Sequence, residues 1–253
     1  MRQLDCLKLV YRERQLLKRG HLCTVCSEVD QRLPQERKIA RDTLVVPNGV
    51  DTSYFRTISH RDETEGRIVF FGNMSYEPNI DGIRYFCRDI FPSVKRVMPA
   101  ASLKIVGKAP AFSVQERHNG HDIVVTGTVN DVRPYLEESA VAVVPLRIGG
   151  GTRLKILEAM AMGKAVVSTS VGCEGLAVTH GENILISDDP REFAQACVDV
   201  LRNPTLRGRL GAAARRLVCE RYDWEQIRAR LADDYGPPSV GALKMKFHNA
   251  GLK

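Results

Sequence analysis

The residues best suited to chemistry lie in one short stretch. Three consecutive glycines begin it: Gly149, Gly150 and Gly151. They have no Cβ, so an anion can approach their backbone closely. Helical spacing follows over 152–162, and the first N–H groups of a helix lack internal partners and carry partial positive charge. Arg153 and Lys155 add full charges where a helix normally favours acids, a conflict that a bound phosphate would resolve. The stretch therefore predicts an anion-binding site.

Two polar residues extend this candidate site. Thr152 can cap the predicted helix with its hydroxyl. Glu158 stands about two turns in, where its carboxylate can accept hydrogen bonds from sugar hydroxyls. Glycine loops before helices also occur as plain turns in α/β folds, and that alternative stays open. The loop is not a P-loop, because no Gly-Lys-Ser/Thr follows, and it lacks the spacing of the dinucleotide fingerprint.

Alternating elements surround the loop. Apolar runs predict buried strands at 67–71, 102–106, 123–126, 141–146, 165–168 and 183–186. Helical patterns predict helices at 79–98, with a break at Pro92, and at 132–139, 191–202, 205–222 and 224–235. This order predicts an α/β fold with a doubly wound parallel sheet and extra C-terminal helices. Ligands bind beyond the carboxyl ends of strands in such sheets, here at Gly72-Asn73, Gly107-Lys108, Gly127-Thr128 and 147–152.

Three motifs follow one another along the chain. They are VVPNGVDTSYF at 45–55, RIVFFGNMSYEPNIDGIRYF at 67–86 and GGGTRLKILEAMAMGKAVVSTSVGCEGL at 149–176. From about Val25 to Ile227, the chain resembles the Rossmann-like donor-binding domain of GT-B glycosyltransferases, in the retaining, nucleotide-sugar-dependent group called family 4. Glu158 matches the second glutamate of that family's Glu-x7-Glu motif, whereas the first would fall at Gly150 and is missing. The family's Arg and Lys after the first strand of the domain are also missing.

The resemblance implies roles for individual residues. Glu158 would hold the ribose, the segment at Gly127 and Thr128 would lie near the base, and Gly72 and Asn73 would face the diphosphate or donor sugar. The glycine loop with Thr152 and Leu154 would complete the donor site, and Arg153 and Lys155 would replace the missing basic pair and act in catalysis. The substrate would be a UDP- or GDP-linked sugar. No Asp-x-Asp motif of the metal-dependent transferases is present, so we expect no metal and no cofactor.

Composition limits the partners and the compartment. The net charge of +7 and the isoelectric point near 9.1 favour anionic partners such as nucleotide phosphates or acidic lipid. Basic residues are scattered and aromatics make up only 6%, which argues against nucleic acid. Seven cysteines, an odd number, suit a reducing compartment, and we expect Cys23 and Cys26 to be small buried residues rather than metal ligands. We therefore expect a cytoplasmic protein, with the inner face of the membrane as an alternative.

Four segments are expected along the chain. Residues 1–46 are interpreted as a remnant of an N-terminal acceptor domain with the crossover, and 47–203 as the nucleotide-sugar donor-binding domain. C-terminal helices follow at 204–235, and a mobile tail at 236–253. The first 20 residues predict a basic amphipathic helix, which suits either peripheral contact with a membrane or packing on a domain.

Three functions remain as alternatives. The first is a glycosyltransferase acting on a saccharide or lipid-linked acceptor, alone or as a donor half with a separate acceptor-domain partner or a second copy of itself. The second is a nucleotide-sugar-binding module without turnover. The third is a dinucleotide-binding protein, which the missing fingerprint glycines disfavour.

Overall fold

The structure is a computed structural model of the chain, and it describes residues 8–12, 14–16, 23–36, 43–58 and 63–235. The helix expected over the first 20 residues therefore lies largely outside the described residues, and the tail expected at 236–253 lies wholly outside them. Residues 8–12 and 14–16 are helical, and no helix in the described part of the chain is long and apolar enough to cross a membrane.

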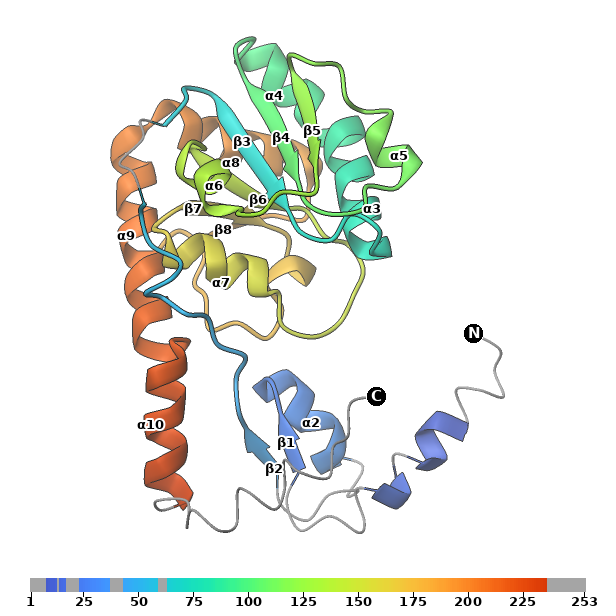
Figure 1. Cartoon of the computed structure of the whole chain (residues 1–253), viewed down its shortest axis with the longest axis vertical. Helices are drawn as coiled ribbons and strands as arrows, with labels where there is room; N and C mark the ends of the chain where they lie inside the picture. The colour runs from blue at the N-terminus through green and yellow to red at the C-terminus, as the bar shows by residue number, and fades with distance from the viewer. Residues whose placement is uncertain (1–7, 13, 17–22, 37–42, 59–62, 236–253) are drawn as a thin grey trace.

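A six-stranded parallel sheet forms the centre of the molecule (Figure 1). Its strands in sequence are β3 (Arg67–Phe71), β4 (Ser102–Val106), β5 (Ile123–Gly127), β6 (Val141–Val144), β7 (Ala165–Ser168) and β8 (Leu185–Ile186). Their order across the sheet is β5-β4-β3-β6-β7-β8, and every neighbouring pair is parallel. The doubly wound parallel sheet expected from the sequence is confirmed. The last strand is shorter than predicted, since it begins at Leu185 rather than at residue 183.

Helices cover both faces of this sheet. They are α3 (Glu77–Tyr85), α4 (Phe91–Val97), α5 (Phe112–Gln115), α6 (Arg133–Glu137), α7 (Leu154–Ala161), α8 (Pro190–Arg202), α9 (Pro204–Arg221) and α10 (Trp224–Tyr235). The crossovers from β3 to β4 and from β6 to β7 run in opposite directions along the sheet, so right-handed connections place their helices on opposite faces. Consistently, α4 contacts α8 while α7 contacts α9.

Burial on both faces explains why the strands are almost purely apolar. All four residues of β6 and of β7 are buried, and so are the last four residues of β3. Such strands are typical of a parallel sheet that lies between two helical layers. The core extends from this sheet into α9 through Leu210, Ala214 and Val218.

The long helix predicted at 79–98 is interrupted where proline predicted a break. A π-helical turn, η1 (Phe86–Ile90), separates α3 from α4, and Pro92 occupies the first turn of α4. Proline has no N–H for the preceding turn, and its ring excludes the regular hydrogen bond there, so the wider turn accommodates it.

A separate small sheet lies below the main one in Figure 1. It pairs β1 (Cys23–Val25) with β2 (Thr43–Val45) in parallel, and α2 (Glu28–Glu36) lies between them in sequence. The connecting segment then reaches the junction of α9 and α10, where Val50 pairs with Asp223. The division at residue 46 and the interpretation of 1–46 as a remnant stay predictions. One expectation is wrong here, because Cys26 is exposed rather than buried.

Candidate functional site

The strand order predicts a crevice between β3 and β6. These two strands are neighbours, and the chain leaves them in opposite directions along the sheet. No crossover helix covers the carboxyl ends at such a point, and ligands of open α/β sheets bind there. Gly72 and Asn73 follow β3 at this edge, and the glycine loop follows β6. Two of the predicted segments therefore flank the same crevice.

The ends of β5, β4 and β3 are in direct contact along this edge. The Gly107 N–H donates to the Gly127 carbonyl at 3.3 Å, and the Gly72 N–H donates to the Val106 carbonyl at 3.0 Å. A Cβ on Gly107 would lie 1.7 Å from the Gly72 carbonyl oxygen, so only glycine fits there. Gly127 has φ +73° and open space around it. The backbone thus forms a continuous rim from Gly127 to Gly72.

Lys155 reaches this rim from the first turn of α7. Its Nζ donates a hydrogen bond of 2.7 Å to Oδ1 of Asn79, a buried residue of α3. The same nitrogen lies 4.2 Å from the ring centroid of Phe70, on β3. A Cβ on Gly72 would stand 3.0 Å from Nζ. Lys155 therefore places a cation at the predicted crevice, beside the residue that follows β3.

Burial changes the ionisation of two side chains on α7. The pKa of Lys155 is lowered to about 7, mainly because burial disfavours the charged form; attraction to Glu158 opposes this shift and repulsion from Arg153 adds to it. Desolvation also raises the pKa of Glu158 above its usual value, while Lys155 acts in the opposite direction. Strongly shifted groups in a crevice are typical of functional sites, although structural ion pairs also produce them.

Arg153 turns back onto the glycine loop instead of pointing along α7. Its Nη1 donates to the carbonyl oxygens of Gly150 and Gly151, the second at 2.6 Å. The side chain is buried, and Nε and Nη2 have no acceptor in the described part of the chain. Buried N–H groups without a partner are costly, and both of these atoms are covered in the structure, so the Arg153 guanidinium is left partly unsatisfied beside the glycine loop.

The predicted cap of α7 is wrong. The helix begins at Leu154, not at Thr152, and its N-cap residue is Arg153, which makes no side-chain cap. The Thr152 hydroxyl is buried and has no hydrogen-bond partner among the described residues. The C-terminal end of α7 lies where the sequence predicted it, because Gly163 ends the helix with φ +69°, a conformation that glycine adopts at little cost.

The remaining predicted site residues lie around the same edge. Glu158 is half-buried one turn beyond Leu154, and Leu154 is exposed. Asn73 uses its side chain locally, since Oδ1 accepts from the N–H and hydroxyl of Ser75. Its carbonyl accepts from Asn79 Nδ2 at 2.7 Å. The backbone rather than the side chain of Asn73 is thus tied to the crevice.

A cavity of about 620 Å³ opens beside Thr128. Thr126 and Asn130 also line it, and Lys104 and Tyr135 form part of its wall. The Lys104 ammonium lies 5.3 Å from the Tyr135 ring centroid and 3.3 Å from Glu138. This cavity lies next to the end of β5, where the sequence placed the nucleotide base.

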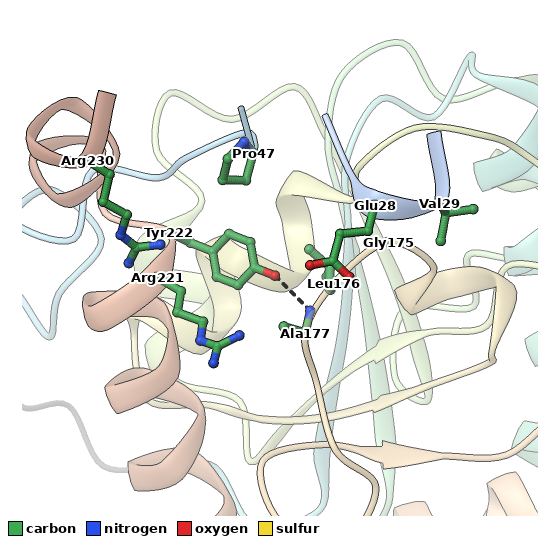
Figure 2. Close-up of a pocket in the computed structure, with 9 residues that line it drawn as sticks. All are labelled: Glu28, Val29, Pro47, Gly175, Leu176, Ala177, Arg221, Tyr222 and Arg230. Atoms are coloured by element: carbon green, nitrogen blue, oxygen red, sulfur yellow. Dashed lines mark hydrogen bonds between the residues drawn. The ribbon is translucent and has the colours of Figure 1, made fainter. Parts of the chain in front are cut away.

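Another pocket lies away from the crevice (Figure 2). It measures about 260 Å³ and is formed by α2, the segment Gly175–Ala177 and the junction of α9 with α10. The Tyr222 hydroxyl accepts a hydrogen bond of 2.7 Å from the Ala177 N–H, and the side chains of Arg221 and Arg230 lie beside it. None of the predicted site residues lines this pocket.

The family model described as "Glycosyl transferases group 1" matches residues 65–203, more than half of the 253 residues. The chain belongs to this family. The matched segment contains β3 to β8 and therefore every residue of the crevice.

Individual relatives of this glycosyl transferase domain are distant. An uncharacterized 44.6 kDa protein in the cps region of Klebsiella pneumoniae is 25% identical over 169 residues, which are 63% of this chain and 43% of the relative. The phosphatidyl-myo-inositol mannosyltransferase of Mycobacterium tuberculosis (strain CDC 1551 / Oshkosh) is 28% identical over 224 residues, 84% of this chain and 58% of the relative. The chain thus spans about half the length of the curated relatives it matches.

Solved structures show the same fold. Anabaena HepE in complex with UDP and glucose has a TM-score of 0.72 at 16% identity, covering 90% of this chain and 66% of that chain. The sucrose-phosphate synthase of Thermosynechococcus elongatus has a TM-score of 0.72 at 20% identity, with coverages of 97% and 63%. These structures support the Rossmann-like domain of GT-B glycosyltransferases as the fold of this chain.

Sequence reasoning missed two residues of the crevice. Gly107 was noticed only as a strand end, although its contact with Gly72 shapes the rim. Asn79 was not predicted at all. It shares the buried face of the helical segment with Ile83 and Phe86, four and seven residues on. A polar residue at a core position of a helix is unusual, and that was the available signal.

Proposed function

We propose that this domain binds the donor of a glycosyltransferase. The donor is a nucleotide-diphosphate sugar, UDP- or GDP-linked, and the acceptor is a saccharide or a lipid-linked acceptor. The transfer retains the anomeric configuration and needs neither a metal nor a cofactor. The observation that carries the proposal is the Lys155 ammonium, held 2.7 Å from Asn79 at the carboxyl edge between β3 and β6.

The charges at the crevice suit the departure of a diphosphate. Cleavage of the bond between the anomeric carbon and the phosphate oxygen leaves negative charge on the nucleoside diphosphate. Fixed cations and N–H groups that face this charge stabilise it as it grows. Lys155 supplies a cation, and the Arg153 guanidinium adds a second positive charge beside the glycine loop. These groups can carry the charge that a divalent metal carries elsewhere.

The rest of the donor fits the neighbouring features. The cavity beside Thr128 would take the base, and Glu158 would accept hydrogen bonds from the ribose. HepE and a Staphylococcus aureus TarM mutant both form complexes with UDP, which supports a uridine donor. The mycobacterial relative is a phosphatidyl-myo-inositol mannosyltransferase, which supports a lipid-linked acceptor.

The acceptor would be placed by residues outside the matched segment. They would come from another part of the protein, from a separate partner or from a second copy. The basic helix predicted from the sequence over the first 20 residues makes peripheral contact with a membrane part of this proposal. Binding without turnover is the second candidate, and Gly150 favours it, because glycine cannot make the contact that a glutamate would make with the donor sugar.

Ligand-induced stabilisation tests donor binding. UDP or GDP at about 100-fold above its dissociation constant should add about 2.7 kcal/mol to the free energy of unfolding. A thermal-shift titration with UDP, GDP and ADP measures this effect. No shift with any of the three at millimolar concentration would refute the proposal.

A product assay separates the transferase from the binding module. The protein is incubated with UDP- and GDP-sugars and with saccharide or lipid-linked acceptors, with and without a chelator, and the product anomer is determined by NMR. Transfer that survives chelation with retained configuration is expected. Tight binding with no product from any donor and acceptor pair would favour the second candidate.

A further inference from the structure

A single amide connects the two sides of the crevice. Asn79 Nδ2 donates to the carbonyl of Asn73 at 2.7 Å, and Asn79 Oδ1 accepts from Lys155 Nζ at 2.7 Å. The loop after β3 is thereby joined to α7 through one buried side chain. The amide cannot turn over, because its NH₂ group would then face the ammonium and its oxygen would face a carbonyl.

The surroundings of the ammonium restrict it to one position. Phe70 covers one side at 4.2 Å, and Gly72 leaves the space that a Cβ would take. Asn79 is the only hydrogen-bond acceptor of Lys155 among the described residues. An ammonium has three N–H donors, so two remain for a ligand. Two charged groups influence Lys155: Glu158 on α7 and Arg153 just before it. The neighbours from the other elements, Phe70 and Asn79, carry no charge.

We propose that Asn79 is a positioning residue, which holds the Lys155 ammonium at the crevice so that it binds the diphosphate of the donor. The inference rests on the proposed function. Asn79 acts through Lys155 and not on the substrate. In this chain the cation that faces the diphosphate then comes from α7, and Asn79 supplies from α3 the contact that fixes it.

Titration of Lys155 in the ligand-free protein tests the contact directly. Lysine labelled with ¹³C at Cε gives one NMR signal per residue, and the Lys155 signal is the one lost in Lys155→Met. Asn79→Asp introduces a carboxylate beside the ammonium and should raise the midpoint of this signal by about one to three pH units. The Asn79→Leu variant, which keeps the shape but removes the acceptor, should lower the midpoint.

Nucleotide affinity then tests the consequence. Asn79→Leu should weaken the binding of UDP or GDP about 10-fold, because it removes a hydrogen bond to a charged group. Combined with Lys155→Met, it should add less than about 3-fold to the loss caused by Lys155→Met alone, since coupled residues are not additive. The matched control is Lys95→Met. Lys95 pairs with Asp122 at 2.7 Å at the opposite edge of the sheet, and its loss should leave the affinity unchanged.

The outcomes separate the inference from the proposed function. Unchanged Lys155 midpoints in both Asn79 variants, or fully additive losses of affinity, would overturn the role of Asn79 even if the nucleotide binds. No binding of UDP or GDP to the wild-type protein at any pH would overturn the proposed function and the diphosphate role of Lys155 together. Melting temperatures of all variants identify any that fail to fold, and the NMR titration of Asn79→Asp still decides in that case, because the side chain keeps its size.

Discussion

Gly107 and Gly72 meet so closely that a methyl group on Gly107 would lie 1.7 Å from the Gly72 carbonyl oxygen. Gly107 also has φ +150°, a conformation that side chains rarely adopt. The two strand ends therefore touch at the candidate site only because residue 107 is glycine. This contact brings the rim at Gly127 and the crevice at Gly72 onto one surface.

Replacing Gly107 should damage both stability and binding. The Gly107→Ala variant must relieve the backbone clash and adopt a strained φ, and together these should lower the free energy of unfolding by about 3 kcal/mol. Urea unfolding measures the loss. Gly120→Ala is the matched control: it has φ +82° but open space, so it should cost only about 1 kcal/mol. Equal losses in the two variants would contradict the close contact.

Lys155 should give the domain a distinctive pH dependence. Its pKa is lowered to about 7 by burial, whereas a lysine in an unfolded chain titrates near ~10.4. Between these values the unfolded state binds more protons, so the contribution of Lys155 to the free energy of unfolding rises as the pH increases from about 7 to about 10. Below pH 7 the charge is present in both states and this gain is absent.

A comparison with Lys155→Met isolates this effect. Burial raises the pKa of Cys87 to about 11, which makes the free energy of unfolding fall at alkaline pH. This loss is the same in the wild type and in Lys155→Met. The wild type should therefore gain stability relative to Lys155→Met between pH 7 and pH 9.5, as measured by urea unfolding. Parallel curves over this range would show that the lysine keeps an ordinary pKa.

Much of this architecture was predictable because its signals are local. The runs at 67–71 and 165–168 became strands with the predicted bounds, since apolar runs flanked by glycine or turn residues have few alternatives. The strand order was not predictable, because it depends on which distant segments pair. The glycines and cations named from the sequence stay a predicted site, and the contact of Asn79 with Lys155 joins residues 76 positions apart and leaves no local pattern.

The failed cap at Thr152 has a physical reason. A threonine before a helical pattern usually caps it, because its hydroxyl accepts from a free N–H of the first turn. Here Arg153 folds onto the carbonyls of Gly150 and Gly151 and occupies the cap position itself. The sequence pattern cannot reveal that a tertiary contact of the side chain shifts the start of the helix by two residues.

Glu158 should contribute to nucleotide binding more than to folding. The carboxylate is half-buried near the crevice, and a hydrogen bond to a charged group is worth about 1.5–3 kcal/mol, or roughly 10- to 100-fold in affinity. Glu158→Ala should lower the affinity for UDP or GDP by this factor in calorimetry, with little change in melting temperature. The control is Glu220→Ala, an exposed residue of α9. If both variants bind equally well, Glu158 is an ordinary surface carboxylate.

The contact between α9 and the end of α7 should be sensitive to one methyl group. A Cβ on Gly211 would lie 2.0 Å from the carbonyl oxygen of Gly163, the residue that follows α7 and leads into β7. Gly211→Ala should therefore push α9 away from the sheet and lower the free energy of unfolding by about 2–3 kcal/mol, measured by urea denaturation. Gly208, one turn earlier on the same helix, has nothing within 4 Å of its Cβ position. Gly208→Ala should raise the free energy of unfolding by roughly 0.5–1 kcal/mol, because alanine is the better helix former. Opposite signs for two identical substitutions on one helix can come only from packing, and a stabilising Gly211→Ala would mean that α9 does not lie against Gly163.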